Sequence, residues 1–277
     1  MRSIDLHAHL TPQCLWTAKG KDWHGTSYEK KGDQYSLVTK GRSRPSGPKE
    51  RFTPEERIKD MDTAGTDVHV LSLTPFLFNY DLEPQLAVKA ARDVNEEISG
   101  MTKKWPQRFK GLATLPLPDV KTSVAELEHS MKVLGLKGAE LDTQVNGRAW
   151  DEPQFEPVFQ AAEQLGAVLF FHPGSNLVSG AIPRYHLGNT IGNPLEDTLV
   201  IAALIFGGVL ERHPNLKAVI AHGGGSACYG IARMDRGWQV RREARTNIQH
   251  PPSSYLRRLY YDCITWNEAA LRFADHA

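Results

Sequence analysis

Residues 3–9 read SIDLHAH, a short apolar stretch that brings His7 and His9 to the end of a predicted strand. Alternate residues of a strand point to the same side, so the two imidazoles share a face and could chelate one metal ion. Two polar side chains that only face solvent at a strand end explain the pattern about equally well. The rest of the chain has to decide between the two interpretations.

Six further segments are short, apolar and rich in β-branched residues, and we predict a strand in each. Longer segments with helical periodicity lie between them. This alternation is typical of parallel strands joined by crossover helices. The predicted strands are 67–74, 109–117, 136–143, 167–173, 216–224 and 259–265, and the predicted helices are 54–64, 84–104, 121–133, 154–165 and 194–212.

Histidines recur where these strands end, at His172 in FFHPG and at His222 in IAHGGGS. In a (β/α)8 barrel the carboxyl ends of the strands carry the active site. A doubly wound sheet would place ligands similarly, but its glycine-rich dinucleotide fingerprint is missing after the first strand. We therefore predict an α/β protein of the TIM-barrel type, with residues 1–277 as one domain and with the histidines used in metal binding or catalysis.

Residues 11–52 interrupt this rhythm, because they are rich in Gly, Lys, Ser and Pro. Within them, YEKKGDQYSLVTKG predicts a small hairpin that turns at Gly32 and Asp33. Since the segment follows the first strand, we expect a small cap inserted over the mouth of the barrel.

Composition places further limits on function. The chain has a formal net charge of +1, which provides no general field for nucleic acid or an anionic membrane. Its three cysteines, Cys14, Cys228 and Cys263, have no spacing that indicates a disulfide framework or a zinc knuckle. The longest apolar run, residues 199–210, is shorter than the roughly 20 residues that cross a bilayer. We expect a cytoplasmic protein that binds neither nucleic acid nor membrane.

Four stretches resemble the metal-dependent decarboxylase branch of the amidohydrolase superfamily. They are DLHAHLTP at 5–12, FFHP at 170–173, AHGGGSACYGIARMDRGW at 221–238 and HPPSSYLRRLYYDC at 250–263. The His-Gly-Gly-Gly-Ser block is much more specific than the paired histidines. The resemblance runs from residue 2 to the end of the chain. It implies a barrel fold and a mononuclear carboxy-lyase that acts on a small unsaturated or aromatic carboxylic acid.

The resemblance also implies roles for the histidines. It makes His7, His9 and His172 the ligands of one divalent metal ion, Zn²⁺ or Mn²⁺, and makes His222 the residue that activates metal-bound water. Neutral imidazole is a good zinc ligand, and a bound divalent ion lowers the pKa of its water toward about 7. His222 could accept the proton, since an unperturbed histidine titrates near pH ~6.5.

The same resemblance assigns arginines to the substrate carboxylate, which a guanidinium can bind through two parallel hydrogen bonds. Arg233 and Arg241 match arginines that act across a dimer interface in some members, so a homodimer is expected. A third arginine comes from the segment after the first strand, where Arg44 is the preferred match and Arg51 the alternative.

One family feature has no counterpart in the sequence. Family members carry a further aspartate ligand at the end of the eighth strand, whereas this sequence stops at EAALRFADHA. We therefore expect a barrel that lacks the eighth strand and the final helix, with a metal held by three histidines and with uncertain activity. Two other functions stay open: hydrolase or hydratase chemistry at the same metal, and a catalytically impaired truncated fragment.

Several residues keep two interpretations. Asp262 either lines the site or is structural, and the glycines at 223–225 either let backbone approach a metal or substrate or form an ordinary strand-to-helix turn. We expect His69, inside a strand, to be a hydrogen-bonded structural residue. Lys137 precedes its strand instead of ending it, so we expect one metal ion rather than two.

Overall fold

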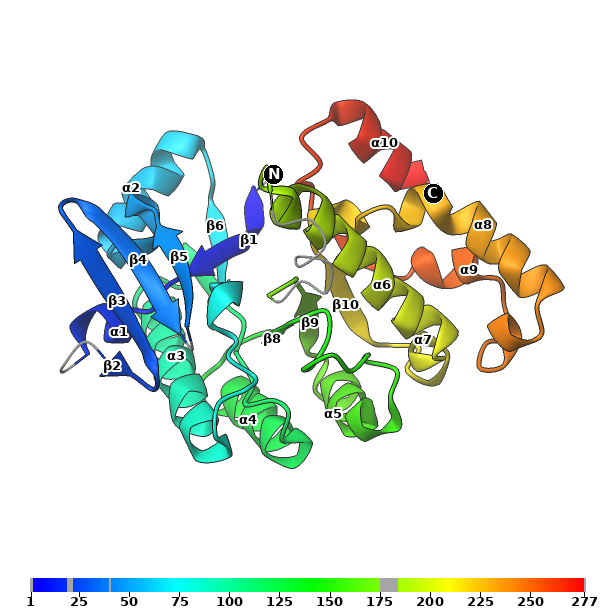
Figure 1. Cartoon of the computed structure of the whole chain (residues 1–277), viewed down its shortest axis with the longest axis horizontal. Coiled ribbons are helices and arrows are strands. Elements are labelled where there is room, and N and C mark those ends of the chain that lie inside the picture. The colour runs from blue at the N-terminus through cyan, green and yellow to red at the C-terminus, as the bar shows by residue number, and fades with distance from the viewer. Residues whose placement is uncertain (1, 19–21, 40, 175–183, 277) are drawn as a thin grey trace. The chain divides into compact units, whose positions relative to one another are not determined.

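The computed structural model describes residues 2–18, 22–39, 41–174 and 184–276. The chain forms two compact units, Met1–Ala139 and Glu140–Ala277, which we call unit 1 and unit 2. Each of the seven segments predicted as strands contains one. Figure 1 labels β1, β6, β8, β9 and β10 among them.

Unit 1 contains a parallel sheet with the strand order β1-β6-β7. Helices alternate with these strands along the chain, as the sequence predicts (Figure 1). An isolated parallel bridge joins Ala113 to Ala139 beyond β7. The elements of this layer are β1 (Ile4–Leu10), α2 (Pro54–Ala64), β6 (Val68–Leu73), α3 (Pro84–Lys104), β7 (Phe109–Gly111) and α4 (Val120–Lys132).

Helix α2 begins and ends where local chemistry dictates. The Thr53 hydroxyl accepts a hydrogen bond from the Glu56 N–H, and the Glu56 carboxylate accepts one from the Thr53 N–H, which forms a capping box. Pro54 occupies the first turn, where its missing N–H costs nothing. Gly65 ends the helix with φ +71°, in the left-handed region that favours glycine. The predicted bounds 54–64 are therefore confirmed.

The segment after β1 folds as an antiparallel meander of four strands with the short helix α1 (Gln13–Thr17) before it. The hairpin between β3 and β4 turns at Gly32 and Asp33, which confirms that prediction. Its placement over a barrel mouth stays a prediction. The four strands are β2 (Asp22–Trp23), β3 (Thr26–Lys31), β4 (Gln34–Thr39) and β5 (Arg42–Ser46).

Unit 2 contains a second sheet with the order β11-β10-β9-β8, in which β10 pairs in parallel with both β9 and β11. Trp150 lies at the centre of its core, with ring centroids 4.9 Å from Phe155 and 5.6 Å from Phe171. The elements are β8 (Gly138–Leu141), α5 (Glu156–Leu165), β9 (Val168–Phe171), α6 (Asn193–Phe206), α7 (Val209–Arg212), β10 (Lys217–Ile220), α8 (Ala227–Val240), α9 (Pro252–Leu256), β11 (Tyr260–Tyr261) and α10 (Glu268–His276).

The structure corrects one predicted helix and the length of several strands. The segment 194–212 forms two helices, because Gly208 between them adopts a left-handed conformation with φ +72°. A side chain at this position would also clash, since a Cβ would lie 2.6 Å from the Asn247 carbonyl oxygen. The strand predicted at 109–117 ends at Gly111, and an isolated bridge from Ala113 to Ala139 follows it. Among the described residues, the paired strands form open sheets and no closed barrel. None of the described helices is long and apolar enough to span a membrane.

Candidate functional site

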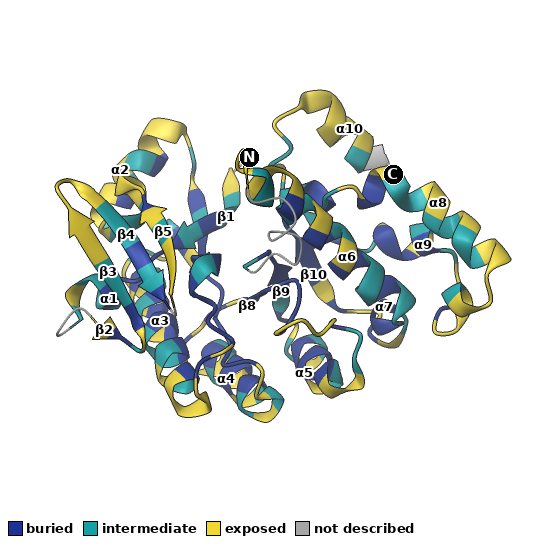
Figure 2. Cartoon of the chain, viewed as in Figure 1, coloured by how far each residue is buried: buried dark blue, intermediate teal, exposed yellow. Residues whose placement is uncertain are grey.

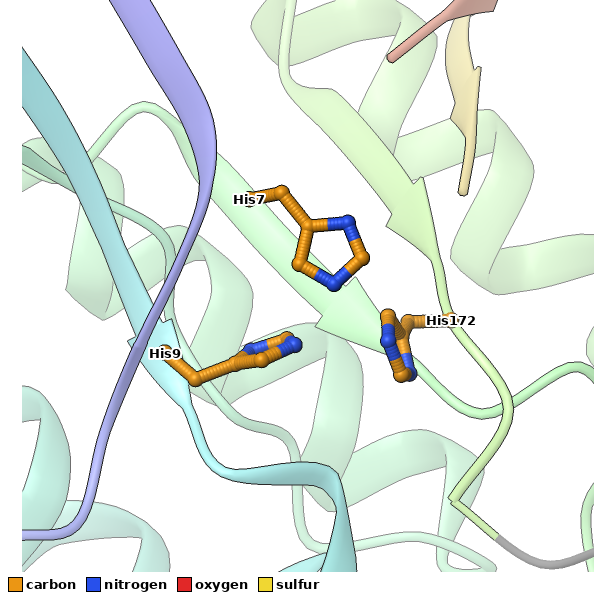
Figure 3. A group of neighbouring side chains, drawn as sticks. All are labelled: His7, His9 and His172. Carbon is orange, nitrogen blue, oxygen red and sulfur yellow. The ribbon is translucent and has the colours of Figure 1, made fainter. Parts of the chain in front are cut away.

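His7 and His9 lie next to each other on β1. Their ring centroids are 4.6 Å apart and the rings meet edge to face at 72°. The Nδ1 atom of His9 is 3.4 Å from the Ser72 hydroxyl on β6. The predicted sharing of one face by the two imidazoles is therefore confirmed, and Figure 3 shows both rings projecting from the same strand.

A bulge in β1 places Asp5 and His9 on opposite faces of the strand. The pairing with β6 shifts between Asp5 and Ala8, so that Asp5 pairs with His69 whereas His9 pairs with Ser72. Asp5 and His9 are thus one position further apart along β1 than their partners are along β6. Because side chains alternate along a strand and paired residues share a face, the extra residue places Asp5 on the opposite face from His9. Consistent with this, Asp5 Oδ2 lies 3.6 Å from His69 Nε2.

His172 and His222 form a second pair, in unit 2. They follow β9 and β10, and their ring centroids are 4.9 Å apart. The His172 side chain is buried, and its Nδ1 lies 3.0 Å from the Pro173 carbonyl oxygen. A carbonyl can only accept, so Nδ1 carries the proton and Nε2 keeps its lone pair. This is the tautomer in which a histidine can bind a metal through Nε2.

His222 contacts a carboxylate that the sequence analysis did not identify. Its Nδ1 lies 2.8 Å from Oδ2 of Asp197, a fully buried residue of α6. Burial raises the pKa of Asp197 to about 7, although the hydrogen bond from His222 acts in the opposite direction. An available signal was an acidic residue at the start of an otherwise apolar helix, LEDTLVIAALIF, where a charge needs a partner.

Asp262 holds the backbone turn that carries His222. Its carboxylate accepts hydrogen bonds from the N–H groups of His222 and Gly223, each at a distance of 2.9 Å, and from the N–H of Ile264 at 3.1 Å. His222 has φ +51°, which is uncommon for a residue other than glycine and needs such support. These contacts favour the structural interpretation of Asp262.

The three glycines after His222 permit close packing within unit 2. A Cβ on Gly225 would lie 1.9 Å from the Pro194 carbonyl oxygen at the start of α6, and one on Gly224 would lie 2.6 Å from the Tyr261 ring. All three have positive φ between +62° and +74°. The glycines therefore form a turn between β10 and α8 that packs against α6 and β11. An approach to a metal or substrate stays a prediction.

The predicted substrate arginines are not brought to the histidines by any contact among the described residues. Arg44 on β5 donates two hydrogen bonds to Glu50, at 2.6 and 3.2 Å, and Arg51 stacks over Tyr35 at 3.9 Å. Arg233 on α8 and Arg241 just after it are exposed, and Figure 2 shows much of α8 as intermediate or exposed. Neither side chain has a hydrogen bond or ion pair with a described residue. Their roles stay predictions.

The chain is similar to several proteins of known identity. A family model described as Amidohydrolase matches residues 4–268. The 2-amino-3-carboxymuconate-6-semialdehyde decarboxylase of Dictyostelium discoideum is 33% identical, over 98% of this chain and 76% of the relative.

Two solved structures are also similar. The apo form of IDCase from Metarhizium anisopliae has a TM-score of 0.84 at 24% identity and covers 100% of this chain and 81% of its own. The 5-carboxyvanillate decarboxylase of Novosphingobium aromaticivorans, solved with manganese and 4-hydroxy-3-methoxy-5-nitrobenzoic acid, has a TM-score of 0.72 at 26% identity, over 79% of this chain and 65% of its own. The likeness confirms the predicted α/β fold of the TIM-barrel type.

Proposed function

Because the chain belongs to the amidohydrolase family, we propose that it is a metal-dependent decarboxylase of a small unsaturated or aromatic carboxylic acid. The relatives named above support this proposal, since the one from Dictyostelium and the one from Novosphingobium are both decarboxylases. The first substrate to test is 2-amino-3-carboxymuconate 6-semialdehyde, from the relative that is 33% identical.

The proposed ligands of one divalent ion are His7, His9 and His172, drawn as sticks in Figure 3. Three neutral imidazoles suit Zn²⁺, and manganese occurs in the similar 5-carboxyvanillate decarboxylase. The proton on His172 Nδ1 supports the assignment, because it leaves Nε2 as the donor atom. When bound, the ion supplies Lewis acidity, which lowers the pKa of a ligated water and polarises substrate oxygens.

His222 is the proposed general base. When Asp197 is ionised, the His222 Nδ1–H donates to its carboxylate, so Nε2 presents a lone pair that can accept a proton from water. The two contacts of Asp262 with the backbone of His222 and Gly223 hold the ring at the end of β10. This pairing of His222 with a buried carboxylate is the single observation that carries the proposal, since it orients an imidazole for proton transfer.

Substrate carboxylate binding is assigned to Arg44, Arg233 and Arg241. Arg233 and Arg241 support a further proposal, that the protein acts as a homodimer, because both are exposed and free of described partners. Light scattering of the purified protein tests the dimer. Arg233→Ala is expected to raise KM with little effect on kcat, and unchanged kinetics would contradict its role.

The reaction is tested by supplying zinc-loaded or manganese-loaded protein with the semialdehyde and measuring released CO2. Release of one CO2 per substrate consumed is expected. Net addition of water without CO2 would contradict decarboxylation and favour the hydrolase or hydratase alternative. Protein that binds no metal and converts no substrate would support the catalytically impaired alternative.

Variants separate the two roles of the histidines. His172→Ala should abolish metal binding, as measured by elemental analysis, whereas His222→Ala should retain the metal and lose turnover by about 100-fold or more. His250→Ala is the control, because His250 is exposed and is assigned no role. Full metal content in His172→Ala would remove it from the ligand set.

A further inference from the structure

We infer that Asp5 and Arg57 are positioning residues, which hold the backbone of the His7–His9 segment so that the two imidazoles are fixed before a metal binds. The inference rests on the proposed function, because it takes these two histidines as metal ligands. It concerns unit 1 alone.

Asp5 holds His7 through the bulge. Its Oδ1 accepts a hydrogen bond from the His7 N–H over 2.9 Å. The extra residue of a bulge falls outside the regular ladder of a sheet, so its backbone groups need other partners. The Asp5 carboxylate supplies such a partner two residues away. The same hydrogen bond holds the bulge in place. The bulge reverses the alternation of side chains along β1, so it affects the direction in which His7 projects.

Arg57 holds His9 from helix α2. Arg57 is only 8% exposed. Its Nη2 donates a hydrogen bond to the His9 carbonyl oxygen at a distance of 2.9 Å. Burial lowers the pKa of Arg57, while the negative charges of Asp5 and Asp60 raise it. A buried charge is costly unless it is compensated, and the negative charges of Asp5 and Asp60 offset part of that cost.

The hydrogen bonds of Asp5 and Arg57 hold the backbone of β1 on either side of the histidine pair. One engages the N–H of His7 and the other the C=O of His9. Fixing the backbone between these points removes freedom that the ligands would otherwise lose when metal binds. Mutation of residues that hydrogen-bond to metal ligands typically lowers metal affinity by about 10–100-fold.

The starts of β1 and β6 offer a comparable pair of backbone contacts that involve no proposed metal ligand. Asp67 accepts a hydrogen bond from the Ser3 N–H over 2.8 Å, and Arg108 donates to the Asp67 carbonyl oxygen over 2.9 Å. These residues anchor backbone as Asp5 and Arg57 do, but away from the histidines. Substitutions at Asp67 and Arg108 therefore report the cost of loosening unit 1 in general.

Open space beside Arg57 allows its side chain to be replaced with little disturbance of the packing around it. It borders a cavity of about 140 Å³ that is also lined by His9, Asp60 and His69. Arg57→Met keeps much of the side-chain length and loses the donor, whereas Arg57→Lys keeps a charge and a donor. Asp5→Ala removes the acceptor, and Asp5→Asn keeps an acceptor oxygen without the charge.

The test is a titration of the metal-free protein with Co²⁺, monitored by the visible absorption of bound cobalt. Thermal unfolding of each metal-free variant is measured alongside. Arg57→Met and Asp5→Ala are expected to lower cobalt affinity about 10–100-fold. Arg108→Met and Asp67→Ala should leave it near the wild-type value even where Tm falls equally. Arg57→Lys and Asp5→Asn should show smaller losses in the same direction, and they decide the question if the larger changes prevent folding.

Two kinds of failure are distinguishable. If cobalt binds wild type and is lost in His172→Ala, but every Asp5 and Arg57 variant binds it as wild type does, the positioning inference is wrong and the metal site stands. The inference is equally wrong if the control variants lose as much affinity. If wild type binds no cobalt, or binds it independently of His172, the proposed metal site itself is wrong.

Discussion

Asp197 and His222 are 25 positions apart in the sequence and lie 2.8 Å apart, carboxylate oxygen Oδ2 to imidazole Nδ1. One is buried in the first turns of α6, and the other follows β10. When Asp197 is ionised its carboxylate can only accept, so Nδ1 of His222 carries the proton and Nε2 is the atom that can accept another.

Asp197→Asn is expected to lower kcat by at least about 100-fold while metal content stays at the wild-type level. An amide can donate to Nδ1, which favours the tautomer with its proton on Nε2 and removes the base. Steady-state kinetics and elemental analysis of the same preparation provide the measurement. A rise in KM without a fall in kcat would contradict the orienting role, and Asp197→Glu should recover part of the rate.

Asp197 should also make the stability of the metal-free protein depend on pH. Burial raises its pKa to about 7, above the value of 3.8 expected for an exposed aspartate. Between about pH 4 and pH 7 the folded chain therefore holds a proton that the unfolded chain releases. The free energy of unfolding falls as pH rises through this window and is level above it.

Asp197→Asn removes this titration. The stability of the variant relative to wild type should therefore be greater at about pH 8 than at about pH 5, as measured by urea unfolding at both values. Parallel pH profiles for the two proteins would show that Asp197 does not titrate in this range.

Arg44 and Arg51 can be separated by their effect on substrate capture. Arg44→Met is expected to raise KM by about 10-fold, which corresponds to about 1.4 kcal/mol, with kcat nearly unchanged. Glu50→Gln should weaken the bidentate pair that holds Arg44 and make the arginine easier to engage. If Arg51→Met raises KM instead, Arg51 is the substrate arginine.

Gly225→Ala should destabilise the protein by at least about 2 kcal/mol, because the new Cβ would clash with the Pro194 carbonyl oxygen at a residue with φ +62°. Gly230→Ala is the matched control. Gly230 lies inside α8, where a Cβ would meet none of the described atoms within 4 Å, so alanine there should stabilise by about 0.5–1 kcal/mol. Chemical unfolding measures both, and equal effects would contradict the close approach.

Much of the fold follows from signals that act over a few residues. The bounds of α2 follow from Thr53, Pro54 and Gly65, and the β3–β4 turn follows from Gly32 and Asp33. Alternation of apolar strands and amphipathic helices indicated the fold class, and histidines at strand ends indicated the candidate site. These features depend on backbone conformation and on periodicity, which neighbouring residues determine.

Other features depend on how distant elements pack and could not be read from local patterns. The bulge that turns Asp5 away from His9 is visible only in the register of β1 against β6. The contact of Arg57 with His9 joins a helix and a strand 48 residues apart, and that of Asp197 with His222 needs α6 to pack beside the end of β10. Local patterns thus identified the histidines that are proposed to carry the chemistry and the strands that present them. The buried charges that support those histidines emerge only from the folded chain, because strand register and helix packing set a side chain's partner, whatever its neighbours in the sequence.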